Sequence, residues 1–302
     1  MSTPLTSLPP HETMLLNMGP QHPSTHGVLR LLLELDGEIV VDAHPDIGFL
    51  HTGIEKSMEY RTFHQAITLT DRIDYLSPYS NNLAYVNAVE KLFGITAPPR
   101  ASWLRVLIAE LHRIGSHLVW LGTTGIDLAA SSVLIYTFRE REEILKLMEE
   151  LSGARMMTSF IRIGGLPADV PPGFLDGVGR FLERMTARLP EYDDLLKDNP
   201  IFKARTVGIG RISAADAVAR GMTGANLRAT GVAYDVRRAF PYEVYPELSF
   251  DVPTATAGDS YARYRVRRRE IEERIRICRQ VLDRLPDGPI HIDDTTEAYP
   301  SR

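Results

Sequence analysis

The sequence predicts an α+β protein in which a short β-rich start is followed by a long, predominantly helical body. Near the N-terminus, Asp36-Gly37 separates two apolar, β-prone runs, which is the strongest short-range signal for a hairpin. After Pro98-Pro99, apolar side chains recur every three or four residues, the pattern of an amphipathic helix. Two more long segments, 131–151 and 260–285, also show helical patterning.

Composition excludes several classes of protein. The 302 residues, 44% of them hydrophobic and 24% charged, suit one large or two ordinary soluble globular domains. A net charge of −5 offers no general basic surface for nucleic acid. The single cysteine, Cys278, excludes a disulfide framework and any metal cluster built on this chain's own thiolates. The N-terminus lacks the features of a signal peptide, and no run of about 18 apolar residues predicts a membrane span.

The sequence predicts how the chain is divided and how its strands follow one another. We expect a flexible lead over 1–12, a single domain over 13–285 that is β-rich over 13–43 and helical over 57–285, and a tail over 286–302. The hairpin strands are expected at 28–35 and 38–42, with a third strand at 14–18 and a turn-rich link over 44–55.

The helical body adds shorter segments to its three long helices. Helices are expected at 82–92 and 171–190, while residues 199–251 are rich in Gly and Pro and should be irregular with short helices.

Polar residues inside the helical segments have ordinary structural interpretations. The dense charges at 139–143 suit a solvated helix face with local ion pairs. The basic run at 263–269 suits a face that is solvated or turned toward another subunit. His112 and His117 lie on or beside the apolar face of the 99–118 helix, where a core histidine bonded to a neighbour is expected.

Two histidines occupy the most distinctive stretch, 19–27, which reads G-P-Q-H-P-S-T-H-G. Pro20 and Pro23 fix φ and remove backbone donors, so the segment is too broken for a helix. His22 and His26 are therefore expected on a loop, with His26 at the mouth of the rigid hairpin. A pair of loop histidines without chemistry is the alternative.

Tyr75 and Asp127 are further candidates. Tyr75 lies within 70–77, between a carboxylate and a hydroxyl and just before a helical run. Asp127 lies within 121–128, expected to be a Gly/Thr break between two long helices, where an N-cap is the alternative role. The remaining candidates suit either chemistry or a network of ion pairs: His51, Glu55, Lys56, Arg61 and Arg72.

The available side chains favour proton donation over hydrolysis or metal chemistry. The hydrolase motif G-x-S-x-G and the zinc motif H-E-x-x-H are absent. Tyr and His can donate hydrogen bonds and protons to a two-electron acceptor such as a quinone. Their ordinary pKa values, about 10 and about 6.5, leave both largely able to do so around neutral pH. An Asp beside the His would fix its tautomer.

Long motifs in one order carry a family resemblance. The chain contains N-M-G-P-Q-H-P-S-T-H-G-V-L-R-L, H-T-G-I-E-K, R-I-D-Y-L, P-P-R, F-R-E-R-E, I-R-I-G-G and L-R-A-T-G-V-A-Y-D-V-R-R-A-F-P-Y. From Met14 to Ile292 it resembles the D-type or 49-kDa-type subunit of respiratory complex I, NADH:quinone oxidoreductase.

The resemblance implies a fold and a set of roles. The family shares the fold of nickel-iron hydrogenase large subunits, but Asp74 and Ser77 stand where hydrogenases have nickel-binding thiolates, so no metal is expected. Tyr75 and His26 match the residues that bind the quinone headgroup, and Asp127 matches the carboxylate paired with that histidine. His22 shapes the same loop, and Arg72 matches an arginine beside the neighbouring iron-sulfur cluster.

The resemblance also implies partners and a place. This chain alone would bind no cofactor: quinone is the substrate, the four-iron cluster lies in the B subunit, and NADH is oxidised in another subunit. The expected partners are the B subunit, the C subunit (fused in some cases) and other subunits of the peripheral and membrane arms. The complex would lie on the cytoplasmic face of the bacterial membrane, or on the matrix side in mitochondria.

Three points stay open on sequence alone. Family chains continue beyond the position where this one stops, so the chain is expected to lack their C-terminal portion. The electron donor could be a ferredoxin or a reduced coenzyme instead of NADH. The chain could also be an assembly scaffold without a working quinone site.

Overall fold

The computed structural model describes residues 13–292. The chain divides into two compact units, Met1–Ser57 and Met58–Arg302, and the division falls within helix α1 (Ile54–Met58). The single-domain organisation expected for residues 13–285 stays a prediction, and the expected flexible lead lies outside the described residues.

The first unit is built on a three-stranded antiparallel sheet in the order β1-β2-β3, which confirms the predicted hairpin and third strand. The strands are β1 (Met14–Met18), β2 (Arg30–Asp36) and β3 (Ile39–Asp46), and a 3₁₀ turn, η1 (Pro23–Thr25), lies between the first two.

Two details of the hairpin differ from the prediction. Asp36 pairs with Ile39, so the chain reverses over Gly37 and Glu38, one residue later than expected, with Gly37 at φ +60°. β3 also continues to Asp46 and includes Pro45, which was expected in a link. Proline is tolerated there because β3 is an edge strand.

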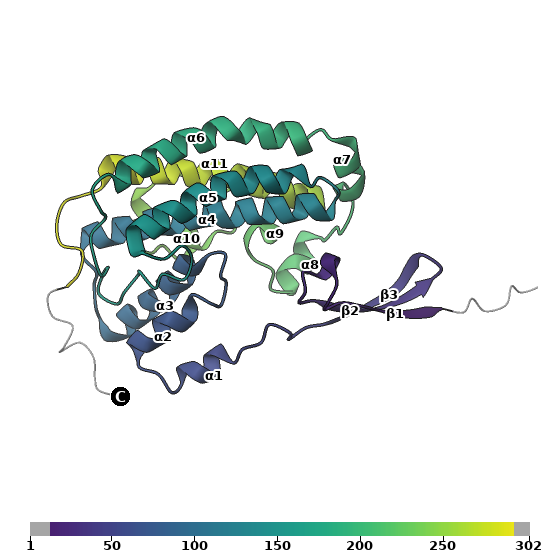
Figure 1. Ribbon diagram of the computed structural model, residues 1–302, viewed down its shortest axis with the longest axis horizontal. Helices are drawn as coiled ribbons and strands as arrows, with labels where there is room; N and C mark the ends of the chain where they lie inside the picture. The colour runs from purple at the N-terminus through teal and green to yellow at the C-terminus, as the bar shows by residue number, and fades with distance from the viewer. Residues whose placement is uncertain (1–12, 293–302) are drawn as a thin grey trace, which may run out of the picture. The chain divides into compact units, whose positions relative to one another are not determined.

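The second unit is helical (Figure 1). Its longer helices are α2 (Phe63–Thr70), α3 (Pro78–Phe93), α4 (Pro99–Asp127), α5 (Ser132–Ser152), α6 (Phe174–Leu196) and α11 (Ser260–Arg284). Its short helices are α7 (Pro200–Thr206), α8 (Ala214–Ala219), α9 (Gly224–Arg228), α10 (Val236–Ala239) and the 3₁₀ turn η2 (Tyr245–Glu247). The long helices and the irregular 199–251 segment were both predicted. The combination of a small sheet and a long helical body is α+β.

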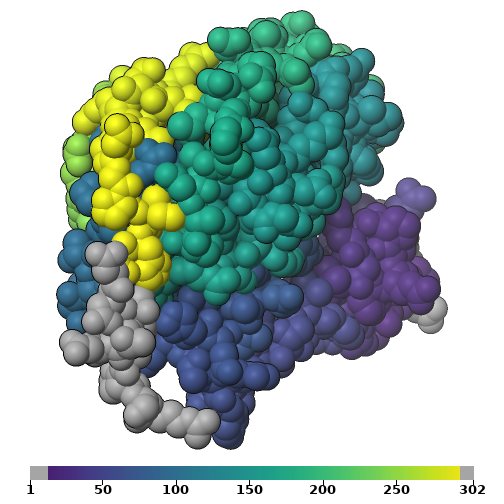
Figure 2. Space-filling model, turned by 60° about the vertical axis from the view of Figure 1, so that its left-hand side comes forward, coloured from purple at the N-terminus to yellow at the C-terminus, as the bar shows by residue number. Residues whose placement is uncertain are grey.

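Helix α4 forms the centre of this unit, because it packs against α3, α5 and α11. The core contains fully buried side chains such as Leu104, Leu107 and Ile108 from α4. α6 packs on both α5 and α11 (Figure 1), and in Figure 2 the yellow residues of α11 lie at the surface beside the teal-green residues of these helices. Among residues 13–292, no helix combines the length and the apolar character that a bilayer crossing requires.

Two expectations about the helices need correction. α6 continues through Pro190 to Leu196, because Leu189 and Tyr192 on its buried face keep it in the core. The charges at 139–143 form local pairs, as expected, such as Arg139 with Glu140 at 2.7 Å, but they are not all solvated. Glu140 is buried and accepts a hydrogen bond from the Tyr192 hydroxyl on α6 at 2.9 Å.

A buried arginine explains the I-R-I-G-G motif. Arg105 on α4 donates to Glu90 at 2.7 Å, to Glu243 at 3.0 Å and to the carbonyl of Gly165 at 3.2 Å. Gly165 also lies against residue 290, since a Cβ on it would come 2.1 Å from the Ile290 carbonyl oxygen. The start of the expected tail is therefore paired with residues 164–166.

Candidate functional site

Tyr75 lies on the turn between α2 and α3, and the first anchor of this turn is the buried carboxylate of Asp71. Its Oδ2 accepts hydrogen bonds from the backbone N–H of Ser159 at 3.0 Å and from the Ser159 hydroxyl at 2.6 Å. Ser159 belongs to the loop after α5, so the bonds tie two segments together that are 88 residues apart. Asp71 and Ser159 were not predicted, because nothing in the local sequence indicates their pairing.

Asp74 supplies the second anchor of the turn. Its Oδ1 accepts from the backbone N–H of Leu76 at 3.0 Å, and its carbonyl accepts from the Asn81 side chain at 3.1 Å. Tyr75 is 49% exposed between these fixed residues. The turn therefore presents an aromatic hydroxyl residue on a backbone that is held from both sides.

Arg72 shares this turn with Tyr75. Its side chain is exposed, and Nη1 donates to the carbonyl of Thr68 one helical turn earlier. The guanidinium thus covers the C-terminal end of α2, where a positive charge interacts favourably with the helix dipole.

His22 and His26 flank the 3₁₀ turn η1 in the first unit, and both are exposed. Nδ1 of His22 accepts from the backbone N–H of Ser24 at 3.1 Å, and His26 ends the turn in the left-handed conformation with φ +53°. Between them, the buried Thr25 hydroxyl donates to the carbonyls of Pro20 and His22 at 3.2 and 2.9 Å. The loop thus holds the His22 imidazole by a hydrogen bond of its own and fixes the backbone of His26, whose N–H donates to the carbonyl of Pro23 at 3.2 Å.

Asp127 is the last residue of α4, and the expected Gly/Thr break does not exist. Gly122 and Gly125 serve close helix packing instead: a Cβ on Gly122 would come 2.5 Å from the Thr137 hydroxyl, and one on Gly125 2.9 Å from the Cβ of Val133. Asp127 is also not the N-cap of α5, since that position is Ser131.

Asp127 lines a hollow of about 490 Å³ together with three arginines, which we call the basic hollow. Arg205 comes from α7, while Arg263 and Arg267 come from successive turns of α11. The other lining residues are Trp120, Thr124, Leu128, Phe202, Thr206, Ile209, Asn226, Ser260 and Tyr264.

The structure groups the predicted residues into three places. Tyr75 and Arg72 share one turn, His22 and His26 share one loop of the first unit, and Asp127 ends α4 in the second unit. The pairing of His26 with Asp127 and their grouping around one ligand stay predictions. Among residues 13–292, no cluster of three or more His, Cys, Asp or Glu side chains suits a metal ion.

Comparison with known proteins gives the family. Residues 127–302 match the model of the respiratory-chain NADH dehydrogenase 49 kDa subunit. The chain is 59% identical to the second D-type subunit of the NADH-quinone oxidoreductase of Roseiflexus sp. (strain RS-1), over 96% of this chain and 70% of the relative. It is 57% identical to the second D-type subunit of Chloroflexus aurantiacus, over 96% and 72%, and 61% identical to the first D-type subunit of Roseiflexus castenholzii, over 92% and 67%.

The chain belongs to the 49 kDa subunit family. This confirms the resemblance drawn from the ordered motifs.

A buried network of ion pairs was not predicted from the sequence. Three of its residues come from the motif L-R-A-T-G-V-A-Y-D-V-R-R-A-F-P-Y. Arg237 donates to Glu110 of α4 at 3.0 Å and to Asp235 at 2.6 Å. Arg228 donates to Glu270 of α11 at 2.7 Å, and Arg274 lies between Glu110 and Glu270, 3.2 Å from each.

His117 completes this network, with Nε2 at 2.9 Å from Glu270, which confirms a core histidine bonded to a neighbour. Burial raises the pKa of Glu110, but the guanidiniums of Arg113, Arg237 and Arg274 outweigh burial and lower that pKa to about 2. The sequence signal that could have indicated this network was the position of two polar residues, Glu110 and His117, on the apolar face of the 99–118 helix.

His112 behaves differently from His117. It is buried with its ring edge-on to Tyr79, 4.5 Å between ring centroids, and its Nε2 has no hydrogen-bond partner among the described residues. Burial, reinforced by the charge of Arg141, lowers the pKa of His112 to about 3. The imidazole is therefore a neutral core group, and the expected bond from Nε2 is not formed.

Proposed function

We propose that this chain is the subunit of a proton-translocating NADH:quinone oxidoreductase that forms the quinone headgroup site together with the iron-sulfur B subunit. Membership of the 49 kDa subunit family supports the complex. The observation that carries the site is the Tyr75 turn, which keeps an exposed phenol on a backbone anchored by Asp71 and Asp74.

The proposed roles follow from hydrogen-bond chemistry. Reduction of a quinone to a quinol takes up two electrons and two protons. The Tyr75 hydroxyl donates to one headgroup carbonyl, and the His26 ring donates to the other. Asp127 pairs with His26 and favours its protonated form. His22 shapes the loop, and Arg72 lies beside the cluster of the B subunit. Positioned donors of this kind typically contribute about 10²–10⁴-fold to rate.

The rest of the proposal concerns the other subunits of the complex, its place at the membrane and the fold of this chain. The chain binds no cofactor itself, electrons arrive from the four-iron cluster of the B subunit, and NADH is oxidised in another subunit. The C subunit and other subunits of both arms complete the complex, which lies on the cytoplasmic face of the membrane. The helical body adopts the fold of nickel-iron hydrogenase large subunits, with Asp74 and Ser77 in place of the metal-binding thiolates.

The decisive experiment measures NADH:quinone reductase activity, and its sensitivity to a quinone-site inhibitor, in membranes where this chain is the only D-type subunit. Tyr75→Phe keeps the ring and removes the donor, so we expect activity to fall by about 10²-fold or more with assembly retained. Tyr136→Phe, a partly exposed tyrosine on α5, is the matched control and should leave activity unchanged.

Three other outcomes would change the proposal. Unchanged turnover in Tyr75→Phe contradicts the role of Tyr75. A wild-type complex that assembles but has no activity would indicate that the chain is an assembly scaffold. Activity with reduced ferredoxin but not with NADH would indicate that ferredoxin is the electron donor.

Asp127→Asn separates a proton-linked role from a structural one. Because the amide cannot stabilise a charged imidazole, we expect slower quinone reduction in an assembled complex, measured in the same membranes. A complex that fails to assemble would make Asp127 a structural residue.

A further inference from the structure

Two arginines of the basic hollow, Arg263 and Arg267, donate only to neutral acceptors within residues 13–292. Arg263 donates to the carbonyls of Gly210 and Gly258 at 3.0 and 2.9 Å and to the Ser260 hydroxyl at 2.8 Å. Arg267 donates to the Asn226 side chain at 3.0 Å. These contacts hold the two side chains in place without neutralising them.

The charge of the hollow is unbalanced. Three arginines face one carboxylate, Asp127, and no other charged side chain among the described residues lines the hollow. Two carboxylates outside the lining lie near these arginines, Asp259 near Arg263 and Glu270 near Arg267. Both have other partners: Glu270 binds Arg228 and His117, and Asp259 caps α11 through the backbone N–H of Ala262.

Partial burial makes this imbalance costly. It lowers the pKa of Arg263 and lowers that of Arg267 to about 10, because each guanidinium loses water without gaining an equivalent carboxylate. Arg267 also stacks over the Trp120 ring, with its guanidinium carbon 4.4 Å from the ring centroid. The hollow therefore presents fixed positive charge that an incoming anion would compensate.

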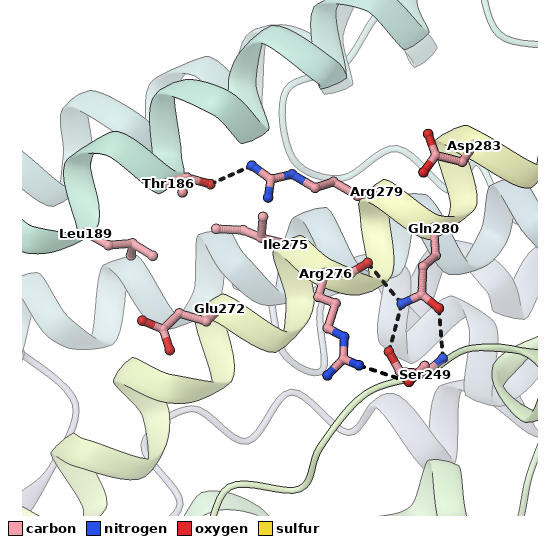
Figure 3. A pocket seen from close by; sticks show the side chains of 9 residues that line it. All are labelled: Thr186, Leu189, Ser249, Glu272, Ile275, Arg276, Arg279, Gln280 and Asp283. Carbon is pink, nitrogen blue, oxygen red and sulfur yellow. Dashed lines mark hydrogen bonds between the residues drawn. The ribbon is translucent and has the colours of Figure 1, made fainter.

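A second hollow of similar size shows the contrasting case (Figure 3). It lies between α6, α11 and Ser249, and its lining contains two arginines and two carboxylates, those of Glu272 and Asp283, so opposite charges are equal in number. Arg276 also lies 3.5 Å from Asp251 and 3.6 Å from Glu273 outside the lining. There, Arg279 donates to the Thr186 hydroxyl and Arg276 to the Ser249 hydroxyl, each at 3.0 Å. Charge excess is thus a property of the basic hollow and not of every arginine-lined hollow on α11.

The size and walls of the basic hollow select the kind of anion. Its volume of about 490 Å³ is many times the roughly 30 Å³ that one water molecule takes up in the liquid, so one small inorganic anion cannot fill it. Trp120, Leu128 and Phe202 add an apolar wall beside the arginines. An acidic peptide segment offers both the carboxylates and the apolar contacts, and Arg binds carboxylates through a bidentate fork.

We propose that the basic hollow docks an acidic segment of a neighbouring subunit, whose carboxylates bind Arg263 and Arg267. This inference rests on the proposed function, because it requires the chain to be assembled with other subunits.

Charge reversal on α11 tests the docking. The double variant Arg263→Glu and Arg267→Glu should reduce the amount of this chain in the membrane-bound complex at least tenfold, measured on native gels. The matched control reverses Arg265 and Arg269, which lie exposed on the same helix, and should assemble like the wild type. Circular dichroism of each purified chain checks folding. Normal assembly of the first variant overturns the docking, whereas failure of the wild type to assemble overturns the proposed function instead.

A cross-link identifies the occupant directly. In the assembled complex, Arg267→Lys places an amine in the hollow, and a carbodiimide should join it to an Asp or Glu of another subunit, read by mass spectrometry. Arg265→Lys should give no such product. A cross-link to this chain's own carboxylates, or phospholipid retained by the wild type and lost with Arg267→Glu, would overturn the proposal. An Arg267→Lys complex without any cross-link would also overturn it.

Discussion

The helical unit contains two groups of arginines that differ in how their charge is neutralised. Around Glu110 and Glu270, arginines from three segments meet buried carboxylates of the same chain. In the basic hollow, Arg263 and Arg267 meet carbonyls, a hydroxyl and an amide. The first group pairs with carboxylates of the same chain, although Nη1 of Arg274 has no hydrogen-bond partner among the described residues. The second group has only neutral hydrogen-bond acceptors among the described residues.

The comparison shows that burial alone does not tell what an arginine does. A buried ion pair adds little net stability over a hydrophobic replacement, yet removing one partner is strongly destabilising because the other charge stays behind. Arginines with internal partners are therefore sensitive to mutation through the fold. Arginines without such partners should be sensitive only through what they bind.

The largest expected effect comes from breaking the first group. Glu110→Gln leaves Arg237 and Arg274 without their shared carboxylate and should lower the free energy of unfolding by about 3–5 kcal/mol. Urea unfolding of the full chain measures this loss. Glu183→Gln, on the exposed face of α6, is the control and should change it by less than about 0.5 kcal/mol. Equal effects of both would contradict the distinction.

Acid should remove the same stabilisation in the wild type. Because the pKa of Glu110 is about 2 in the folded protein against an ordinary 4.5, its stabilisation is complete above pH 4.5 and lost as the pH falls toward 2. The difference in unfolding free energy between wild type and Glu110→Gln should therefore shrink across this range. Urea titrations at several pH values test it, and a constant difference would show that charge is not the cause.

A smaller effect is expected at the anchor of the Tyr75 turn. Ser159→Ala removes one of the two donors to Asp71 and should cost about 1–3 kcal/mol of unfolding free energy. Ser131→Ala is the control, because Ser131 is exposed and its side chain makes no capping hydrogen bond at the start of α5. In the assembled complex, the looser turn should raise the KM for quinone, and an unchanged KM would separate the anchor from the site.

The smallest effect on stability belongs to the basic hollow. Arg267→Gln loses the stacking on Trp120 but also removes an uncompensated charge, so the unfolding free energy should change by less than about 1 kcal/mol. Thermal unfolding of the full chain measures it. A loss as large as that of Glu110→Gln would show that Arg267 belongs to the internal network.

The sequence predicted elements better than contacts between them. Asp36-Gly37 indicated the hairpin, because its turn preference is local, and the 3.6-residue period indicated α4 and α11. Gly122 and Gly125 misled for the same reason: their local preference suggests a break, whereas the close approach of Val133 and Thr137 on α5 requires them inside a helix.

The candidate site follows the same division. Tyr75 could be found from motifs, but its anchor could not, since Asp71 and Ser159 are distant in sequence. Glu140 likewise looked solvated within its charge run, whereas in the structure it is buried and bound both by its neighbour Arg139 and by the distant Tyr192 hydroxyl on α6. The basic hollow combines α7 and α11, so a tertiary structure was needed to see it.

Helix α4 has 29 residues and is therefore roughly 43 Å long. It carries Arg105 near one end, Glu110 and His117 along its middle, and Asp127 at its final residue. Gly122 and Gly125 pack α4 closely against α5 just before that end, so the backbone that leads to Asp127 is fixed to the neighbouring helix. A displacement of α4 along its axis would therefore reach both Asp127 and the ion pairs of Glu110, which join α4 to two other segments of the chain.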